Sequence, residues 1–225
     1  MSDSVIPPAT PAATVILLRD GDAGLETLML HRSSKVAFGG MWVFPGGRVD
    51  DGDRRADDPD DEPSARRAAA REAAEECSLL VEPSDLVPFS HWTPPAETPR
   101  RYATWFFVAR ASDGEVLVDG GEIREHAWLT PEEVLDRRAR AEVDLAPPTF
   151  VTLADLAEQA SVEGALAAAA QRNPVPRYST RWGAVDGGAV ALWHGDAGYD
   201  TNNPDEPGPR HRLWMRPEGW LLERT

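Results

Sequence analysis

Apolar residues near the start of the chain occur in short runs that are separated by turn-forming residues. The stretch ATVILLRD (13–20) contains an uninterrupted apolar run, and LETLMLHR (25–32) alternates after the turn sequence GDAG. An uninterrupted run of this length indicates a buried strand, whereas alternation indicates a strand with one face toward the core. We therefore expect a β-hairpin over residues 13–32.

Later runs of the same kind predict further strands. The stretch MWVFPGGRV (41–49) begins as a strand and ends in a tight Pro-Gly-Gly loop. We expect two more strands at 85–95 and 100–111. Residues 124–143 predict a short strand that leads into a helix. Thr130 is a suitable N-cap for that helix, because Pro131 then occupies its first position.

An alanine-rich stretch lies between the third and fourth predicted strands. Its sequence SARRAAAREAAEE has high helix propensity throughout, so we expect a helix that begins at Pro63-Ser64 and reaches about residue 80. The preceding segment, DDGDRRADDPDDE (50–62), carries eight acids against two arginines. Such a concentration of like charge predicts a solvated loop.

The pattern after residue 145 is less regular. Residues 152–171 contain one or two helices, and the runs 188–195 and 210–223 predict a hairpin around a long turn, DAGYDTNNPDEPGP. The order of elements predicts an α/β sandwich with a mixed sheet and a C-terminal helical and hairpin extension. We expect a disordered N-terminus (1–11), a main domain (12–145), and an extension (146–225) that packs on that domain or across a homodimer.

Composition and charge narrow the classes of function. The chain has 225 residues, of which 41% are hydrophobic, so it can bury a sizeable core. Its net charge of −15 argues against binding to a nucleic-acid polymer, which needs clustered lysine and arginine. The N-terminus resembles no secretory signal, and no apolar run approaches the roughly 18 residues of a membrane span. We expect a cytoplasmic protein with no membrane partner.

Three glutamates in the predicted helix form the strongest chemical signal. Glu72, Glu75 and Glu76 are spaced so that a helix brings their carboxylates to one face. Like charges at this spacing cost roughly 0.2–0.5 kcal/mol per pair. The face is either a solvated acidic surface or a site for a divalent cation, which would offset the repulsion.

Other residues that often carry chemistry give weaker signals. The single cysteine, Cys77, follows Glu76, whose charge raises the pKa of a neighbouring thiol, so we do not expect a nucleophile. Trp42 and Trp92 are candidates to line a pocket, and core packing is the alternative that we favour for each.

The Gly-Gly loop and the acidic helix together resemble the signature of the Nudix hydrolases, G-x5-E-x7-R-E-U-x-E-E-x-G-U, where U is a bulky apolar residue. Gly47 opens the pattern, the stretch REAAEECSL (71–79) supplies its second half, and FPGG (44–47) and AWLTPEE also match this family. The resemblance covers roughly residues 12–145, and it implies an α/β/α sandwich.

Two departures from the signature affect its early part and its end. Counted from Gly47, the first acid is Asp53, and 17 residues separate it from Arg71 where the pattern has seven. The acidic segment is therefore an insertion, and Glu62 is an alternative to Asp53 as the early acid. The second glycine of the signature is Ser78, at the C-terminal end of the helix, where glycine eases the turn.

The resemblance implies a metal-dependent diphosphatase. Mg²⁺ prefers carboxylate oxygens and water, and Mn²⁺ is a possible substitute. Glu75 and Glu76 are the first choices as metal ligands, and Glu72 either completes the cluster or acts as the base. Arg71 can pair with a glutamate and hold its rotamer.

Further site residues follow from the same resemblance. The family often draws another acid from the loop before the later tryptophan, and Glu122 and Glu125 are both candidates for it. Gly46 and Gly47 would let the backbone approach the metal or the phosphates closely, although a plain turn is the alternative.

The substrate implied is a small molecule in which a nucleoside diphosphate is linked to another group. Part of the upstream sequence resembles the branch that contains coenzyme A diphosphatases, although position 36 is Val where that pattern has Arg. Arg100 and Arg101 could bind the additional phosphate of coenzyme A by bidentate contacts. The alternatives are ADP-ribose, nucleotide sugars, dinucleoside polyphosphates and damaged nucleotides, or a non-catalytic module that senses a nucleotide.

Overall fold

The computed structural model describes residues 8–33, 39–118, 120–183 and 185–225, and these divide into two compact units. The larger unit contains residues 12–90 and 105–176, and the smaller unit contains residues 1–11, 91–104 and 177–225. Most of the N-terminus expected to be disordered lies outside the described residues, but Thr10 and Pro11 belong to the first strand.

The larger unit is built on a mixed sheet whose strands follow the order β3-β2-β1-β6-β5. The predicted hairpin is confirmed, because β1 and β2 pair antiparallel with Leu18 opposite Thr27. Two more strands join this path, β4 alongside β1 and β7 alongside β2. The bounds of the strands are β1 Thr10–Gly21, β2 Gly24–Arg32, β3 Trp42–Val43, β4 Gly46–Arg48, β5 Val87–Thr93, β6 Tyr102–Arg110 and β7 Ile123–Leu129.

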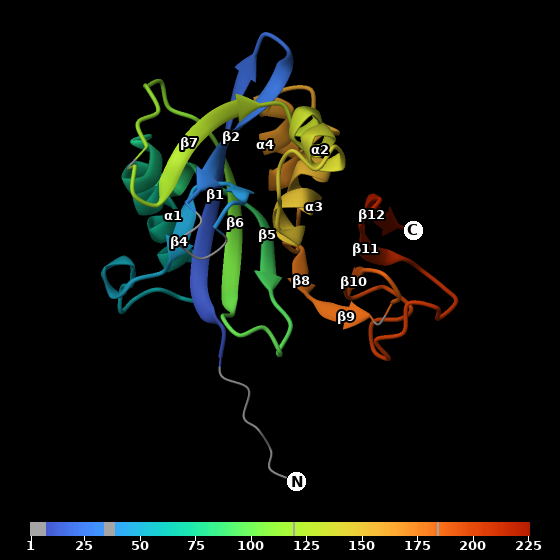
Figure 1. The fold of residues 1–225 in the computed structure, drawn as a ribbon. Helices are drawn as coiled ribbons and strands as arrows, with labels where there is room; N and C mark the ends of the chain where they lie inside the picture. Colours follow the sequence, from blue (N-terminus) through green and yellow to red (C-terminus); the bar gives the residue numbers. More distant parts are fainter. Residues whose placement is uncertain (1–7, 34–38, 119, 184) are drawn as a thin grey trace. The chain divides into compact units, whose positions relative to one another are not determined.

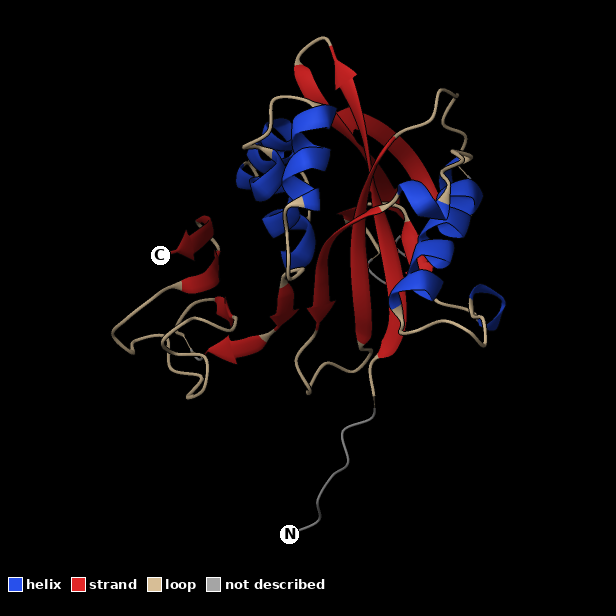
Figure 2. Ribbon diagram, turned by 180° about the vertical axis from the view of Figure 1, so that it is seen from behind, coloured by secondary structure: helices blue, strands red, loops and turns tan. Residues whose placement is uncertain are grey.

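Helices cover both faces of this sheet, which gives the α/β/α sandwich (Figure 1). Helix α1 (Glu62–Cys77) packs on one face, where Val15 and Leu17 of β1 belong to one buried cluster with its alanines. The side chains between them, Ile16 and Leu18, are also fully buried. Consecutive residues of a strand point to opposite faces, so a strand with both faces covered needs an uninterrupted apolar run. The opposite layer contains three helices, also visible from behind in Figure 2: α2 Pro131–Ala139, α3 Pro147–Leu156 and α4 Val162–Ala170.

Helix α1 spans Glu62–Cys77, close to its predicted range. Small buried alanines allow its axis to lie near the sheet, since they leave little side-chain volume between the two layers. The helix ends at Ser78, which adopts the left-handed conformation with φ 59°. The signature glycine is therefore replaced by a serine in the conformation that glycine adopts most easily.

Two predictions for the segment before α1 are wrong. The tight loop expected at Pro45-Gly46-Gly47 is partly a strand, since β3 ends at Val43 and Gly46–Arg48 form β4 beside β1. Pro45 separates the two strands because it has no N–H for a ladder, although its carbonyl oxygen accepts a bond from the N–H of Val15. The acidic segment is not solvated throughout, since Asp51–Asp53 form a short 3-10 helix and Asp53 is only 5% exposed. Its carboxylate is buried because it pairs with Arg71.

The smaller unit contains a four-stranded antiparallel sheet, β12-β11-β10-β9. The predicted hairpin between 188–195 and 210–223 is confirmed by the pairing of β10 with β11, but the second run itself folds back into β12. Two short strands were not predicted: β8, which runs parallel to the end of β5, and β9. The bounds are β8 Arg177–Ser179, β9 Arg181–Gly183, β10 Ala189–Leu192, β11 His211–Arg216 and β12 Gly219–Arg224.

A buried ion pair stabilises the long turn of the smaller unit. Asp196 and Arg212 have side chains that are 0% and 1% exposed, and their two bonds measure 2.6 and 2.7 Å. The carboxylate also accepts from the backbone N–H groups of Gly198 and His211, both at 2.8 Å. Burial alone would raise the pKa of Asp196, but these four hydrogen bonds lower it.

None of the helices in the described parts of the chain is long and apolar enough to cross a membrane.

Candidate active site

The predicted Gly-Gly loop and the acidic face of α1 lie side by side. The N–H of Gly46 donates to Oε2 of Glu76 at 2.9 Å, and this glutamate is only 6% exposed. A Cβ on Gly46 would lie 2.5 Å from the carbonyl oxygen of Ala13, and one on Gly47 would lie 2.3 Å from Oε1 of Glu72. Gly46 therefore allows an approach to the backbone of β1 that a side chain would block, whereas at Gly47 only the end of the Glu72 side chain would have to move.

Arg71 connects the remaining acids of the site. One of its terminal nitrogens, Nη1, donates to Glu72 at 2.8 Å and to Glu75 at 3.0 Å. The other, Nη2, donates to Asp53 at 2.9 Å. Glu62, the alternative early acid, pairs instead with Arg66 one turn along the helix. The structure thus places Asp53, and not Glu62, beside the RE–EE group.

Arg32 at the end of β2 was not predicted as a site residue. Its Nη1 donates to Oε1 of Glu76 at 2.9 Å, and its Nη2 donates to Oε2 of Glu122 at 2.6 Å. Of the two late acids, Glu122 therefore joins the cluster through Arg32, whereas Glu125 hydrogen-bonds with His31 at 2.8 Å. No local spacing could have indicated Arg32, because Glu76 lies 44 positions later in the chain.

The electrostatics of the site favour additional positive charge. Burial raises the pKa of Glu76 to about 7, and the charge of Glu72 contributes, despite the bonds from Gly46 and Arg32. Burial likewise raises the pKa of Glu72 against the effect of Arg71, with the charge of Glu75 adding to the shift. Two adjacent carboxylates with raised pKa values are incompletely compensated, so a cation that approached them would be stabilised.

The donor set has the chemistry of a site for a hard divalent cation. Glu72, Glu75 and Glu76 offer carboxylate oxygens from one helix face, as Mg²⁺ and Mn²⁺ require. Among the described residues, no three His, Cys, Asp or Glu side chains converge closely enough to hold an ion as they stand. The carboxylates are instead engaged with Arg32 and Arg71, and a cation would have to replace some of these contacts.

The other predicted residues have surroundings of their own. Arg100 and Arg101 belong to the smaller unit, where Arg100 is exposed and the guanidinium of Arg101 donates to the carbonyl oxygens of Pro94 and Pro95. Their role in substrate binding stays a prediction. Cys77 is fully buried, and burial raises the pKa of its thiol to about 11.

The comparison with families gives one match, a model described as NUDIX domain, over residues 8–150. No curated protein matches the chain. Among solved structures, the fold is similar to a NUDIX hydrolase from Alicyclobacillus acidocaldarius, with a TM-score of 0.64, 23% identity, and coverage of 71% of this chain and 96% of that one.

Two other solved structures share the fold at lower similarity. The NUDIX domain of Shewanella oneidensis NrtR, solved in complex with ADP ribose, has a TM-score of 0.52, 16% identity, and coverage of 70% of this chain and 92% of that one. A MutT NUDIX hydrolase from Burkholderia pseudomallei has a TM-score of 0.50, 19% identity, and coverage of 66% and 98%. At these identities the similarity concerns the fold.

Proposed function

Since the chain belongs to the Nudix family of hydrolases that act on diphosphate bonds, we propose that it cleaves a nucleoside diphosphate linked to another group. The observation that carries this proposal is the position of Glu76. Its carboxylate is buried, held by the N–H of Gly46, and has a pKa raised to about 7 beside a second acid, Glu72. A purely structural carboxylate would be expected to have its charge fully compensated.

The chain's residues would divide the work as follows. Glu72, Glu75 and Glu76 would hold a divalent cation, for which Mg²⁺ is our first choice and Mn²⁺ the second. When bound, that ion supplies charge neutralisation on the diphosphate and acidifies a water ligand. Arg71 orients Glu72 and Glu75, with which it already pairs.

Arg32 and the late acids would complete the site. Arg32 holds Glu76 and Glu122 at the two ends of one guanidinium, so we assign the assisting acid to Glu122 and not to Glu125. Glu72 lies against Gly47 and, as ligand or as base, would act beside this end of β4.

For the substrate, we propose coenzyme A or one of its thioesters as the leading candidate. The proposal rests on the partial resemblance of residues 40–47 to that branch and on Arg100 and Arg101, which could bind a 3′-phosphate. ADP-ribose is the main competitor, because the NUDIX domain from Shewanella oneidensis was solved with ADP ribose. Nucleotide sugars, dinucleoside polyphosphates and damaged nucleotides are further candidates.

The test is a screen of diphosphate compounds with Mg²⁺ or Mn²⁺, followed by mass analysis of the products. We expect cleavage at the diphosphate, and for coenzyme A the products 3′,5′-ADP and a phosphopantetheine. Equal kcat/KM for coenzyme A and its 3′-dephospho form, or a clear preference for ADP-ribose, would overturn the coenzyme A assignment. Binding of a nucleotide without any cleavage would instead identify a sensing module and overturn the enzymatic proposal.

A further inference from the structure

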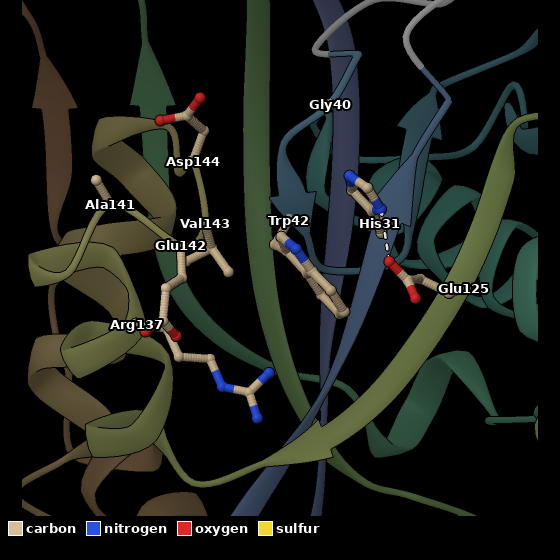
Figure 3. A pocket seen from close by; sticks show the side chains of 9 residues that line it. All are labelled: His31, Gly40, Trp42, Glu125, Arg137, Ala141, Glu142, Val143 and Asp144. Carbon is tan, nitrogen blue, oxygen red and sulfur yellow. Dashed lines mark hydrogen bonds and ion pairs between the residues drawn. The ribbon is translucent and has the colours of Figure 1, made fainter.

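The larger unit contains a second feature that the acid cluster does not use, a pocket of about 290 Å³ (Figure 3). It lies among the ends of β2, β3 and β7 and the segment that follows α2. The side chains on which the argument depends are His31, Trp42, Glu125, Arg137, Val143 and Asp144. Its volume is at the lower limit of the roughly 300–1,000 Å³ typical of ligand sites, so it suits one part of a substrate and not a whole dinucleotide.

The floor of the pocket is a fixed aromatic surface. The ring of His31 stacks on that of Trp42 with centroids 5.2 Å apart and planes 7° from parallel. Glu125 fixes the imidazole through the 2.8 Å bond at Nδ1. Figure 3 shows Val143 and the end of the Arg137 side chain on the side of Trp42 away from His31, with open space between them. A planar ring could enter that space and stack on the indole.

The two walls of the pocket are joined by the backbone. The N–H of Trp42 donates to the carbonyl oxygen of Asp144 at 2.9 Å, and Met41 and Asp144 form an isolated parallel bridge. The spacing between the indole and the segment after α2 is therefore set by main-chain hydrogen bonds. A preformed slot of this kind loses little entropy when a rigid, flat ligand binds.

The charges of the lining exclude a phosphate from this pocket. Three of the lining residues are carboxylates, Glu125, Glu142 and Asp144, and only Arg137 carries a guanidinium. Arg137 is already paired with Glu133, at 2.5 Å, and Glu142 with Arg140, at 2.7 Å, so the argument against a phosphate depends mainly on Glu125 and Asp144. Carboxylates repel a phosphate but accept hydrogen bonds from N–H and O–H groups, so an uncharged ring with such donors is favoured.

The pocket and the acid cluster lie on opposite sides of one strand end. His31 lines the pocket, and the next residue, Arg32, contacts Glu76. These two consecutive residues end β2, where its pairing with β7 shifts register, so a substrate whose diphosphate lies at the acid cluster would have to pass around this strand end to reach the pocket.

We infer that this pocket binds the nucleobase of the substrate, which stacks on Trp42. The inference rests on the proposed function for its connection to the diphosphate, but the pocket can be tested without hydrolysis. Adenosine 5′-monophosphate and ribose 5-phosphate share the sugar and the phosphate and differ in the base. Calorimetric titration of the full chain with each compound, in a buffer with EDTA, therefore measures the contribution of the base alone.

The expected result is that the wild-type protein binds adenosine monophosphate at least about tenfold more tightly than ribose 5-phosphate, as base–aromatic stacking predicts. Trp42→Ala should abolish that difference, and Trp42→Phe should retain most of it. Glu158→Gln, at an exposed position that does not line the pocket, is the control and should leave the difference unchanged. Thermal melting of each variant checks that the short strand β3 still forms, and Trp42→Phe keeps the test valid if Trp42→Ala is unstable.

Two outcomes would overturn the inference: equal affinity of the wild type for both compounds, or an unchanged preference in a folded Trp42→Ala variant. Neither outcome affects the proposed function, which depends on cleavage in the presence of Mg²⁺. Conversely, the protein could cleave no compound and still bind adenosine monophosphate more tightly than ribose 5-phosphate in a way that depends on Trp42. That result would support the base pocket and overturn the enzymatic proposal.

Discussion

The larger and the smaller unit each contain a buried arginine–carboxylate pair, and the two pairs differ in how completely they are satisfied. In the smaller unit, Asp196 accepts four hydrogen bonds, two from Arg212 and two from the backbone. In the larger unit, Glu76 accepts one bond from Arg32 and one from Gly46. The pKa of Asp196 is accordingly lowered, while that of Glu76 is raised to about 7.

The arginines show the same contrast. All three side-chain nitrogens of Arg212 donate, the third to the carbonyl oxygen of Pro204 at 2.6 Å. The Nε of Arg32 is buried and has no hydrogen-bond partner among the described residues. A fully satisfied pair fixes a structure, whereas an incompletely satisfied pair leaves charge that a ligand can use. The difference supports our proposal that Glu76 is a functional residue, and it indicates a structural role for Asp196.

The largest effect is expected from breaking the satisfied pair. Arg212→Met leaves Asp196 buried and uncompensated, and should lower the free energy of unfolding by about 3–5 kcal/mol. Urea denaturation measures this loss. Arg181→Met is the control, because Arg181 is 44% exposed. Its pair with Asp200, its bonds to two backbone carbonyl oxygens and its contact with the ring of Tyr199 lie at the surface and should together contribute about 1–2 kcal/mol. If Arg212→Met lowered the free energy of unfolding no more than the control does, the number of hydrogen bonds that a pair makes would not explain the difference between the pairs.

Breaking the incompletely satisfied pair should affect catalysis more than stability. Glu76→Gln keeps the shape of the side chain but removes the charge, and should lower kcat/KM at least a hundredfold, which is about 2.7 kcal/mol in activation free energy. The exposed Glu158→Gln in the same unit is the control and should retain the wild-type rate. Full activity of Glu76→Gln on the best substrate would refute the assignment of Glu76.

The backbone donor of Glu76 can be displaced separately. In Gly46→Ala, the new Cβ would meet the carbonyl oxygen of Ala13, so β4 must shift, at a cost of about 1–3 kcal/mol. In Gly47→Ala, it would meet only the end of the Glu72 side chain, which can rotate away, so stability should change by less than about 0.5 kcal/mol. Thermal and urea unfolding compare the two. Equal losses would mean that close approach to β1 is not what Gly46 provides.

The smallest effect is a difference in pH dependence. The pKa of Asp196 is lower in the folded state than the usual value of about 4, so its stabilisation is complete above pH 4 and is lost as the pH falls through the folded value. Below pH 4, the slope of the unfolding free energy against pH is proportional to the number of protons taken up on unfolding. Asp196→Asn should reduce that number by up to about one. Parallel curves for wild type and variant would indicate that Asp196 has an ordinary pKa.

Local patterns predicted most of the larger unit and one side of the site. The hairpin of β1 and β2 and the helix α1 follow from periodicity and propensity, because their length makes the signal strong. The three-residue strands β8 and β9 have no period to detect, so their pairing depends on tertiary contacts.

The same division applies to the residues around the acids. Helical spacing brings Arg71 next to Glu75, one turn later, and Glu72 follows it directly in the chain. By contrast, Arg32 meets Glu76 only because the sheet and the helix pack together, and Asp53 is buried only because an arginine 18 positions later reaches it. The number of charges in residues 50–62 does not distinguish this one buried acid from its exposed neighbours. Local patterns in a single sequence do not predict contacts between segments that are far apart in the chain.

The single cysteine, Cys77, can be used to follow the opening of helix α1 by chemical labelling. Cys77 is inaccessible at the last turn of α1, its Sγ lies 3.0 Å from the carbonyl oxygen of Ala73, and a pKa of about 11 leaves almost no thiolate near neutral pH. Alkylating reagents should therefore react only during excursions that detach this turn, which is the turn that carries Glu75 and Glu76. The rate of Cys77 alkylation would then report how readily this turn opens. If Mn²⁺ binds the acidic face, it should slow the alkylation even when no substrate is present.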